Sequence, residues 1–315
     1  MDDRNMITKP IDVLEKYEIR KTQKQKSAFI PAVTGFLERQ GYTVRVEKGK
    51  LGARNIVIGD PSHATYLITA HYDTPASIGL PNLITPCNPI AFIFYQLLMI
   101  AVFFLAAFIA GYAVSLLTDD TILIFWAAYI AYFGLLFLLM FGPANRHNAN
   151  DNTSGVVTVL ETAATMPENL RDKVAFVLFD LEEAGLIGSS SYRKMHKSET
   201  DRQIILNLDC VGDGDEIVFF PTKKLKQDAA KIQQMHKICG RYGHKSISVR
   251  SRGFAYYPSD QKHFPYGVGI SALRRAKGIG LYCGRIHTFR DTILEHSNVN
   301  LLRAALTSLI GSAEP

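Results

Sequence analysis

Six imidazole and carboxylate side chains, far apart along the chain, could together bind metal ions. They are His71, Asp151, Glu182, Glu183, Asp209 and His287. Each lies close to an apolar run that is typical of a strand or to a segment that is typical of a helix start. In the clearest case, the run 174–179 precedes the adjacent Glu182 and Glu183. Two neighbouring carboxylates repel each other and are costly to desolvate together, so this pattern indicates a cation nearby.

The chemistry that this set could support is hydrolysis assisted by divalent metal ions. Two histidines with several carboxylates, and no cysteine among them, suit borderline ions such as zinc. Five ligands with one shared carboxylate would hold two ions about 3.5–4 Å apart and leave one glutamate as general base. Asp73, two residues after His71, would accept the second ring N–H of that histidine and fix its tautomer.

Apolar runs that predict strands alternate with segments that predict helices. Strands are expected at 42–46, 55–58, 64–69, 174–179, 204–209, 216–220, 246–250 and 270–273. Helices are expected at 11–39, from about 156, at 189–195, 226–241 and about 298–310. This alternation predicts an α/β fold, with a mostly parallel mixed sheet and helices on both faces. In such sheets ligands bind at the carboxyl ends of the strands, where the candidate residues lie.

Two long stretches, 89–117 and 121–142, contain no charged side chain. A bilayer core requires roughly 20 apolar residues in a helix, and both stretches reach that length. We therefore expect a transmembrane helical hairpin at 89–142, inserted into one discontinuous domain made of 1–88 and 143–315. The alternative is a pair of buried core helices.

The hairpin would place both flanking segments on one side of the bilayer. Arg146 follows the second stretch closely, whereas the turn between the two stretches carries Asp119 and Asp120 and no basic residue. By the positive-inside rule, this arrangement predicts that the soluble part faces the cytoplasm. The polar sequence at the N-terminus predicts no cleavable signal peptide.

Composition narrows the class of partner. The 315 residues carry a net charge of +6, and the excess of basic residues is spread along the chain without a dense aromatic–basic cluster. That distribution argues against nucleic acid and suits an anionic membrane surface. The basic segment 20–26 is expected to be a solvated face or a lipid contact. The four cysteines show neither zinc-finger spacing nor a disulfide framework, which favours a reducing compartment. Nothing in the sequence predicts the oligomeric state.

The chain resembles metallopeptidase family 28, the di-zinc aminopeptidases related to glutamate carboxypeptidase. The matching segments are Ala70–Pro75, Asn150–Val156, Asp180–Gly188, Asn207–Gly212 and Ile286–His296. The resemblance implies the zinc exopeptidase fold, which is phosphorylase/hydrolase-like, together with two Zn²⁺ ions as cofactors. It also implies a peptide substrate from which N-terminal residues are removed.

Carried over by position, the resemblance implies a ligand set for each ion. His71 and Asp209 would bind one zinc, and Glu183 and His287 the other. Asp151 would bridge the two ions. The resemblance also implies a cis peptide bond directly after Asp151.

Two further roles and two departures follow from the same resemblance. Glu182 would be the catalytic base and Asp73 would orient His71. The family tends to carry Ser-Asp-His-x-x-Phe late in the chain, whereas residues 259–264 here have Gln261 in place of that histidine. The other departure is the hairpin, inserted between the first and second ligand motifs.

The sequence alone is also compatible with two other functional classes. A glutaminyl-cyclase-like zinc aminoacyltransferase shares this fold and would release ammonia from N-terminal glutamine, although the segment 150–155 favours a peptidase. A non-catalytic membrane scaffold would bind no stoichiometric metal. Asp151 follows Gly142 by only a few residues, and an extended residue spans at most about 3.6 Å, so the site is expected near the membrane. The hairpin is then either a plain anchor or a route for hydrophobic, membrane-delivered peptides.

Overall fold

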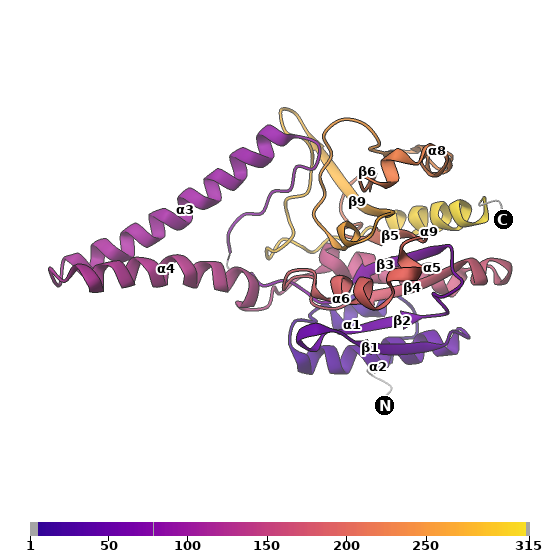
Figure 1. The fold of residues 1–315 in the computed structure, drawn as a ribbon, viewed down its shortest axis with the longest axis horizontal. Coiled ribbons are helices and arrows are strands. Elements are labelled where there is room, and N and C mark those ends of the chain that lie inside the picture. Colours follow the sequence, from indigo (N-terminus) through magenta and orange to yellow (C-terminus); the bar gives the residue numbers. More distant parts are fainter. Residues whose placement is uncertain (1–5, 78, 313–315) are drawn as a thin grey trace.

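The computed structural model describes residues 6–77 and 79–312 and shows a layered α/β body from which two long helices project (Figure 1). The strands are β1 (Val44–Lys48), β2 (Arg54–Ile58), β3 (Tyr66–His71), β4 (Val174–Phe179), β5 (Ile204–Leu208), β6 (Glu216–Pro221), β7 (Gly240–Tyr242), β8 (Lys245–Val249), β9 (Gly267–Ala276) and β10 (Gly280–Tyr282). The α-helices are α1 (Asp12–Tyr17), α2 (Gln23–Arg39), α3 (Pro89–Ser115), α4 (Thr121–Phe141), α5 (Gly155–Thr165), α6 (Ile187–Met195), α7 (Lys197–Thr200), α8 (Ala229–His236) and α9 (His296–Gly311). Every predicted strand is present within a few residues of its expected position.

The strands form one mixed sheet in the order β1-β2-β4-β3-β5-β9-β6-β8-β7, with β10 paired to β9. The central strands β4, β3, β5 and β9 are parallel to their neighbours within that group. Antiparallel pairs flank this centre on both sides. The predicted α/β class and mixed sheet are confirmed, and β6 and β8 form a further parallel pair outside the centre. The candidate residues leave the sheet at the central parallel strands.

Apolar side chains on alternating strand positions fill two core layers. In β4, Phe176 and Leu178 join the larger cluster, which packs under α1, α2, α5, α8 and α9. Val177 and Phe179 point to the opposite face, where Tyr192 of α6 covers them. Because successive residues of a strand face opposite sides, an uninterrupted apolar run such as β4 requires helices on both faces.

Two of the expected helices differ from the structure. The helix predicted over 11–39 is divided into α1 and α2, because Thr22 and Gln25 form a capping box that starts a new helix. The helix predicted over 226–241 ends at His236, and residues 240–242 instead form strand β7. Gly243, with φ of +68°, makes the turn that pairs β7 with β8.

Helices α3 and α4 form a V that is closed at its tip and open toward the body (Figure 1). They approach closely at Gly111, where an added Cβ would lie 3.4 Å from the Cβ of Ala128. The rest of the pair is largely exposed: α4 has no buried residue, and α3 has three, Phe103, Ala107 and Gly111. The alternative of two buried core helices is therefore wrong. Both helices are long and apolar enough to cross a membrane.

Candidate metal centre

The candidate residues converge at the carboxyl ends of the central parallel strands. His71 is the last residue of β3. Because Thr69 is paired with Asn207 in β5, His71 lies abreast of Asp209, which follows that strand. His71 is also paired with Phe179 in β4, which brings the turn after β4 beside it. All six predicted residues line one pocket of about 300 Å³.

The carboxylate of Asp151 lies between the two imidazoles. Its Oδ1 is 3.3 Å from Nε2 of His71, and its Oδ2 is 3.0 Å from Nε2 of His287. Nε2 of His71 is also 3.7 Å from Oδ1 of Asp209, and Nε2 of His287 is 3.6 Å from Oε2 of Glu183. The set therefore divides into two groups that share one carboxylate.

The donor set of this pocket fits divalent cations. Four carboxylates line it, and among the described residues of its wall there is no lysine or arginine. Oε1 of Glu183 is buried without a hydrogen-bond partner. Buried carboxylates without compensating charge are costly, and imidazole combined with carboxylate is the ligand chemistry that zinc prefers. The residues are therefore suited to hold zinc.

The electrostatics of the pocket are dominated by burial and by the crowding of charges. Burial alone would lower the pKa of His71, but Glu182, Asp151 and other carboxylates outweigh it and raise that pKa well above its ordinary value. Burial and the neighbouring Glu183 raise the pKa of Glu182 well above its usual range. In Asp151 burial is outweighed by His287 and His71, so the pKa of this carboxyl is lowered. Asp151 is thus held ionised, while Glu182 retains affinity for a proton.

The backbone is strained beside the candidate ligands. Leu181, Cys210 and His287 have φ angles of 55°, 57° and 58°, a region that residues with a Cβ seldom adopt. Leu181 precedes Glu182, and Cys210 follows Asp209. Such strain persists only where surrounding contacts hold it, and it is concentrated at functional sites.

Asp73 holds more of the site than the sequence predicted. Its carboxylate accepts the backbone N–H groups of Glu182 at 3.0 Å and Glu183 at 3.2 Å. Nδ1 of His71 lies 3.1 Å from the main-chain oxygen of Asp73 and 3.7 Å from its Oδ1. Asp73 therefore positions the histidine mainly through its carbonyl, and the two glutamates through its side chain.

The loop that carries Asp151 is tied to the end of β5. The peptide bond between Asp151 and Asn152 is cis, as the family resemblance implied. The Asn152 side chain donates to the carbonyl of Leu208 at 2.9 Å. Its Oδ1 accepts the N–H groups of Gly155 at 3.0 Å and Cys210 at 3.3 Å. One asparagine thus joins the start of α5 to the loop that presents Asp209.

Asp291 supports the site and was missed by sequence reasoning. Its buried carboxylate accepts the N–H groups of Asn150 at 2.8 Å and Asp151 at 3.0 Å. Burial, together with the charge of Asp151, raises the pKa of Asp291 well above its ordinary value. Asp291 lies four residues after His287, inside the segment Ile286–His296 that resembles the family. That position was the sequence signal from which a role near the site could have been inferred.

Two cations of the basic segment 20–26 are buried beneath the site, so a solvated or lipid-facing segment is the wrong interpretation for them. Lys26 forms an ion pair of 2.5 Å with Asp180, both nearly inaccessible to solvent. Arg20 donates to the carbonyl of Tyr72 at 2.5 Å and to Oγ1 of Thr153 at 3.1 Å. Lys26 falls on the apolar stripe of α2, and that spacing was a usable signal for its burial.

Asp260 was also missed. It is fully buried, and neither carboxylate oxygen has a hydrogen-bond partner among the described residues. Burial, supported by the charges of Asp73 and Asp209, raises the pKa of Asp260 to about 7. The sequence signal was its position in the segment Ser259–Phe264. This segment keeps the aspartate of the family pattern although it lacks the histidine.

Solved structures with the same fold include a Zn-dependent exopeptidase, an aminopeptidase and a glutaminyl cyclase. A Zn-dependent exopeptidase from Parabacteroides distasonis is 15% identical, with a TM-score of 0.60 and coverage of 96% of this chain and 97% of that one. The LapA aminopeptidase of Legionella pneumophila is 14% identical, with a TM-score of 0.55 and coverage of 96% and 67%. A glutaminyl cyclase from Bacteroides thetaiotaomicron is 16% identical, with a TM-score of 0.58 and coverage of 99% and 98%. At these identities the likeness shows the shared fold.

A family match comes from the sequence itself. No curated protein matches the chain. Residues 137–309, more than half of the chain, match the model of peptidase family M28. The match contains four of the five motif segments, and Ala70–Pro75 lies outside it. The resemblance to the family is thereby confirmed. The chain belongs to peptidase family M28 and is a zinc-dependent hydrolase.

Proposed function

We propose that this M28 enzyme is a membrane-anchored aminopeptidase that uses two zinc ions. The observation that carries the proposal is the Asp151 carboxylate, which presents one oxygen to each of the two histidines. His71 and Asp209 would hold one ion, Glu183 and His287 the other, and Asp151 both. Zinc ions bound there would polarise the scissile carbonyl and lower the pKa of a water molecule.

Glu182 is the proposed catalytic base. Its carboxylate lines the pocket, and burial raises its pKa, so it can accept a proton at neutral pH. It takes a proton from the attacking water and delivers it to the amine nitrogen of the leaving product. Asp73 would hold Glu182 in position for this proton transfer, because the Asp73 carboxylate accepts the backbone N–H of Glu182.

Removal of N-terminal residues is the form of hydrolysis that the family supports best. A free α-amino group can bind beside the ions, and relatives with this fold include an aminopeptidase and a Zn-dependent exopeptidase. The competing reaction is that of the glutaminyl cyclases with the same fold. The five candidate ligands arranged around two positions favour the two-metal peptidase over it.

The deciding assay is a substrate panel combined with metal analysis. Aminoacyl-anilides, N-blocked peptides and peptides with N-terminal glutamine are offered to the purified full chain. An aminopeptidase cleaves the anilides, spares the blocked peptides and contains about two zinc ions per chain. Ammonia release from glutamine peptides without cleavage would assign the chain to the cyclase class, and inertness toward all three would favour a scaffold.

We further propose that residues 89–142 span the bilayer and that 1–88 and 143–315 form one catalytic domain on the cytoplasmic side. Large apolar side chains cover the outside of both helices, including Phe104, Phe125 and Trp126. Exposed apolar surface of this extent is characteristic of a membrane contact. The basic Arg146 beside the body and the acidic turn at the tip support the orientation. Protease protection of a tag at the tip in intact cells would test it.

The same site would serve hydrophobic or membrane-associated peptides. A second cavity, of about 450 Å³, lies between the legs of the V and shares four wall residues with the catalytic pocket: Asn82, Met140, Glu183 and His287. Its remaining wall is largely apolar, with Tyr95, Met99, Ile100, Phe103, Tyr132, Leu136 and Leu139 from both helices. A peptide with its terminal residue at the ions could place the following apolar residues there. Equal turnover of soluble and lipid-embedded peptides would contradict this route.

A further inference from the structure

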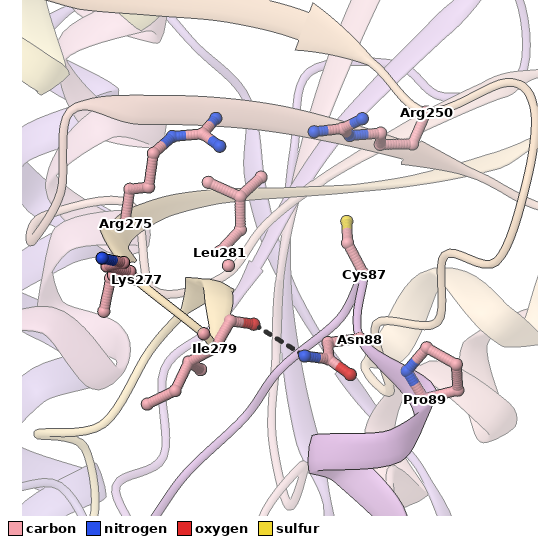
Figure 2. A pocket seen from close by; sticks show the side chains of 11 residues that line it. Cys87, Asn88, Pro89, Arg250, Arg275, Lys277, Ile279 and Leu281 are labelled. Carbon is pink, nitrogen blue, oxygen red and sulfur yellow. Dashed lines mark hydrogen bonds between the residues drawn. The ribbon is translucent and has the colours of Figure 1, made fainter.

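A third cavity, of about 700 Å³, lies at the start of α3 and shares no wall residue with the catalytic pocket. Figure 2 shows the side chains that line it. Its walls are the residues from Cys87 to Pro89, Arg250 after β8, and residues 275–281 of the β9–β10 hairpin. None of the proposed metal ligands lines it. Because three distant parts of the sequence meet there, no single motif marks it.

The charge of this cavity is basic and incompletely neutralised. Arg250, Arg275 and Lys277 line it, and no carboxylate does so among the described residues. The guanidinium groups of Arg250 and Arg275 point toward each other across the space (Figure 2). Glu216 pairs with Arg275 at 3.0 Å, but neither Arg250 nor Lys277 has an ion-pair partner in the described part of the chain. Like charges in this arrangement repel, so an anion between them would be stabilising.

Hydrogen bonding in the cavity is also incomplete. Nε of Arg250 is buried and has no hydrogen-bond partner among the described residues. Arginine presents its N–H groups in a planar fork that matches two oxygens of a phosphate. In Arg275, Nε and Nη2 already donate to Oε1 of Glu216 at 3.1 and 3.0 Å, which leaves Nη1 for a ligand. The fork of Arg250 together with this remaining group favours a ligand with several oxygens, such as a phosphate, over a halide.

The cavity opens where the apolar surface of the hairpin begins. Asn88 caps α3 by accepting the N–H of Ala91 at 3.0 Å, and it donates to the carbonyl of Ile279 at 3.0 Å (Figure 2). The start of this 27-residue helix is therefore fixed to the cavity wall, and its positive dipole end adds to the basic charge. In the next turns, Ile90 is 80% exposed and Phe94 is 69% exposed.

Exposed aromatic side chains lie beside the first turns of α3. Phe254 and Tyr256, in the loop after Arg250, are both about half exposed. The ring of Tyr256 packs edge-on against Phe92 of α3, with centroids 6.0 Å apart. Aromatic residues that border an apolar helix are typical of the boundary between lipid headgroups and hydrocarbon.

We propose that this cavity binds the phosphate of an anionic phospholipid headgroup, with the acyl chains along Ile90 and Phe94. The inference rests on the membrane insertion proposed above. Arg250 and Arg275 would bind the phosphate oxygens, and Lys277 would add charge at the rim. Free phosphate shares the headgroup chemistry, but only a lipid also covers the adjoining apolar turns of α3.

Native mass spectrometry of the full chain, released from nanodiscs, tests the proposal. The discs contain phosphatidylcholine alone or mixed with phosphatidylglycerol, and the retained lipid is counted. Wild type is expected to retain phosphatidylglycerol preferentially, and Arg250→Gln with Lys277→Gln to bind it at least about tenfold more weakly. The matched control, Lys194→Gln with Lys197→Gln, removes two exposed charges of α6 and α7 that line none of the three cavities described, and it should behave as wild type. Both double variants should hydrolyse a soluble anilide normally.

Several outcomes would overturn the proposal. Equal retention of the two lipids by wild type is one, and wild-type retention by the double variant is another. Binding of inorganic phosphate to lipid-free protein without retention of phosphatidylglycerol would assign the cavity to free phosphate. If the double variant loses anilide hydrolysis, Lys277→Gln replaces it; about threefold weaker retention is then expected, and unchanged retention refutes the site. A chain that is soluble without detergent would refute membrane insertion itself, a separate failure.

Discussion

The catalytic pocket and the helical hairpin both depart from the usual pattern of exposed polar groups and buried apolar groups. The pocket buries polar groups, whereas the hairpin exposes apolar ones. The pocket buries His71, Asp151 and Asp209. The hairpin exposes Phe104, Phe125 and other large apolar side chains. Buried charge and exposed apolar surface are both unfavourable in water. Each region is therefore suited to a partner from outside the chain: a cation in the pocket and, in the function proposed here, lipid around the hairpin.

The largest effect is expected from Glu182→Gln, which removes the proposed base and leaves the other carboxylates in place. Glutamine cannot accept the proton of the attacking water, so kcat/KM should fall by about 10²–10⁴-fold. Zinc content, measured by elemental analysis, should stay at the wild-type level. Near-normal activity would remove Glu182 from this role, and loss of zinc would make it a ligand instead.

Zinc affinity should depend strongly on pH in the neutral range. Although burial opposes it, the carboxylates around His71 raise its pKa, so the metal-free histidine stays protonated to a higher pH than the ordinary value of about 6.5. Burial and the neighbouring Asp151 raise the pKa of Glu183 well above its ordinary value. Zinc must displace these protons, so its affinity should fall about tenfold per pH unit for each proton as pH decreases. Competition with a chromophoric chelator measures this, and affinity that is constant from about pH 6 to about pH 8 would contradict it.

Breaking the ion pair beneath the site should destabilise the body and leave the hairpin unchanged. Lys26→Met leaves the buried carboxylate of Asp180 without its cation, which typically costs about 3–5 kcal/mol. Denaturant unfolding of the full chain in detergent measures the loss. Lys24→Met is the matched control, because Lys24 is exposed on the same helix. Equal stability of the two variants would show that the pair contributes nothing net.

The smallest effect is expected in the groove between the helices. Phe103 is 4% exposed and lines the groove, whereas Phe108 is 69% exposed on the same helix. Phe103→Ala should lower kcat/KM for peptides with an apolar second half by about three- to tenfold, since it removes apolar contact area. Neither Phe103→Ala nor Phe108→Ala should alter hydrolysis of a short anilide. Equal losses in both variants would point to a general effect on the hairpin.

The sequence predicted the side chains that lie around the pocket better than the ones that support it. His71, Asp209 and the glutamate pair follow continuous apolar runs of strand length, and such runs can be recognised in a single sequence. The burial of Lys26 and Asp291 was not predicted, because a charged residue is expected to be exposed unless its partner is known. Asp180 lies 154 positions from Lys26, and only the folded sheet brings the two together.

The limits of helices show the same contrast between local and distant information. The charge-free stretches predicted α3 and α4 because length and composition are local properties. The break between α1 and α2 was also locally encoded, by Thr22 and Gln25, but it was overlooked. The end of α8 was locally encoded as well, because Gly243 makes the tight turn that pairs β7 with β8, but this signal was also overlooked. The basic cavity at the foot of α3 depends on three separate segments and could not be read from the sequence at all.

The two legs of the V join the body at separate points, α3 beside the β9–β10 hairpin and α4 beside the loop that leads to Asp151 (Figure 1). A domain tethered by one helix can pivot about its attachment and meet the bilayer at many angles. Two attachments at separate points restrict that rotation, because the domain cannot turn about either helix without displacing the other. Embedded as proposed, the enzyme would keep the mouth of its active site turned toward the lipid throughout each catalytic cycle.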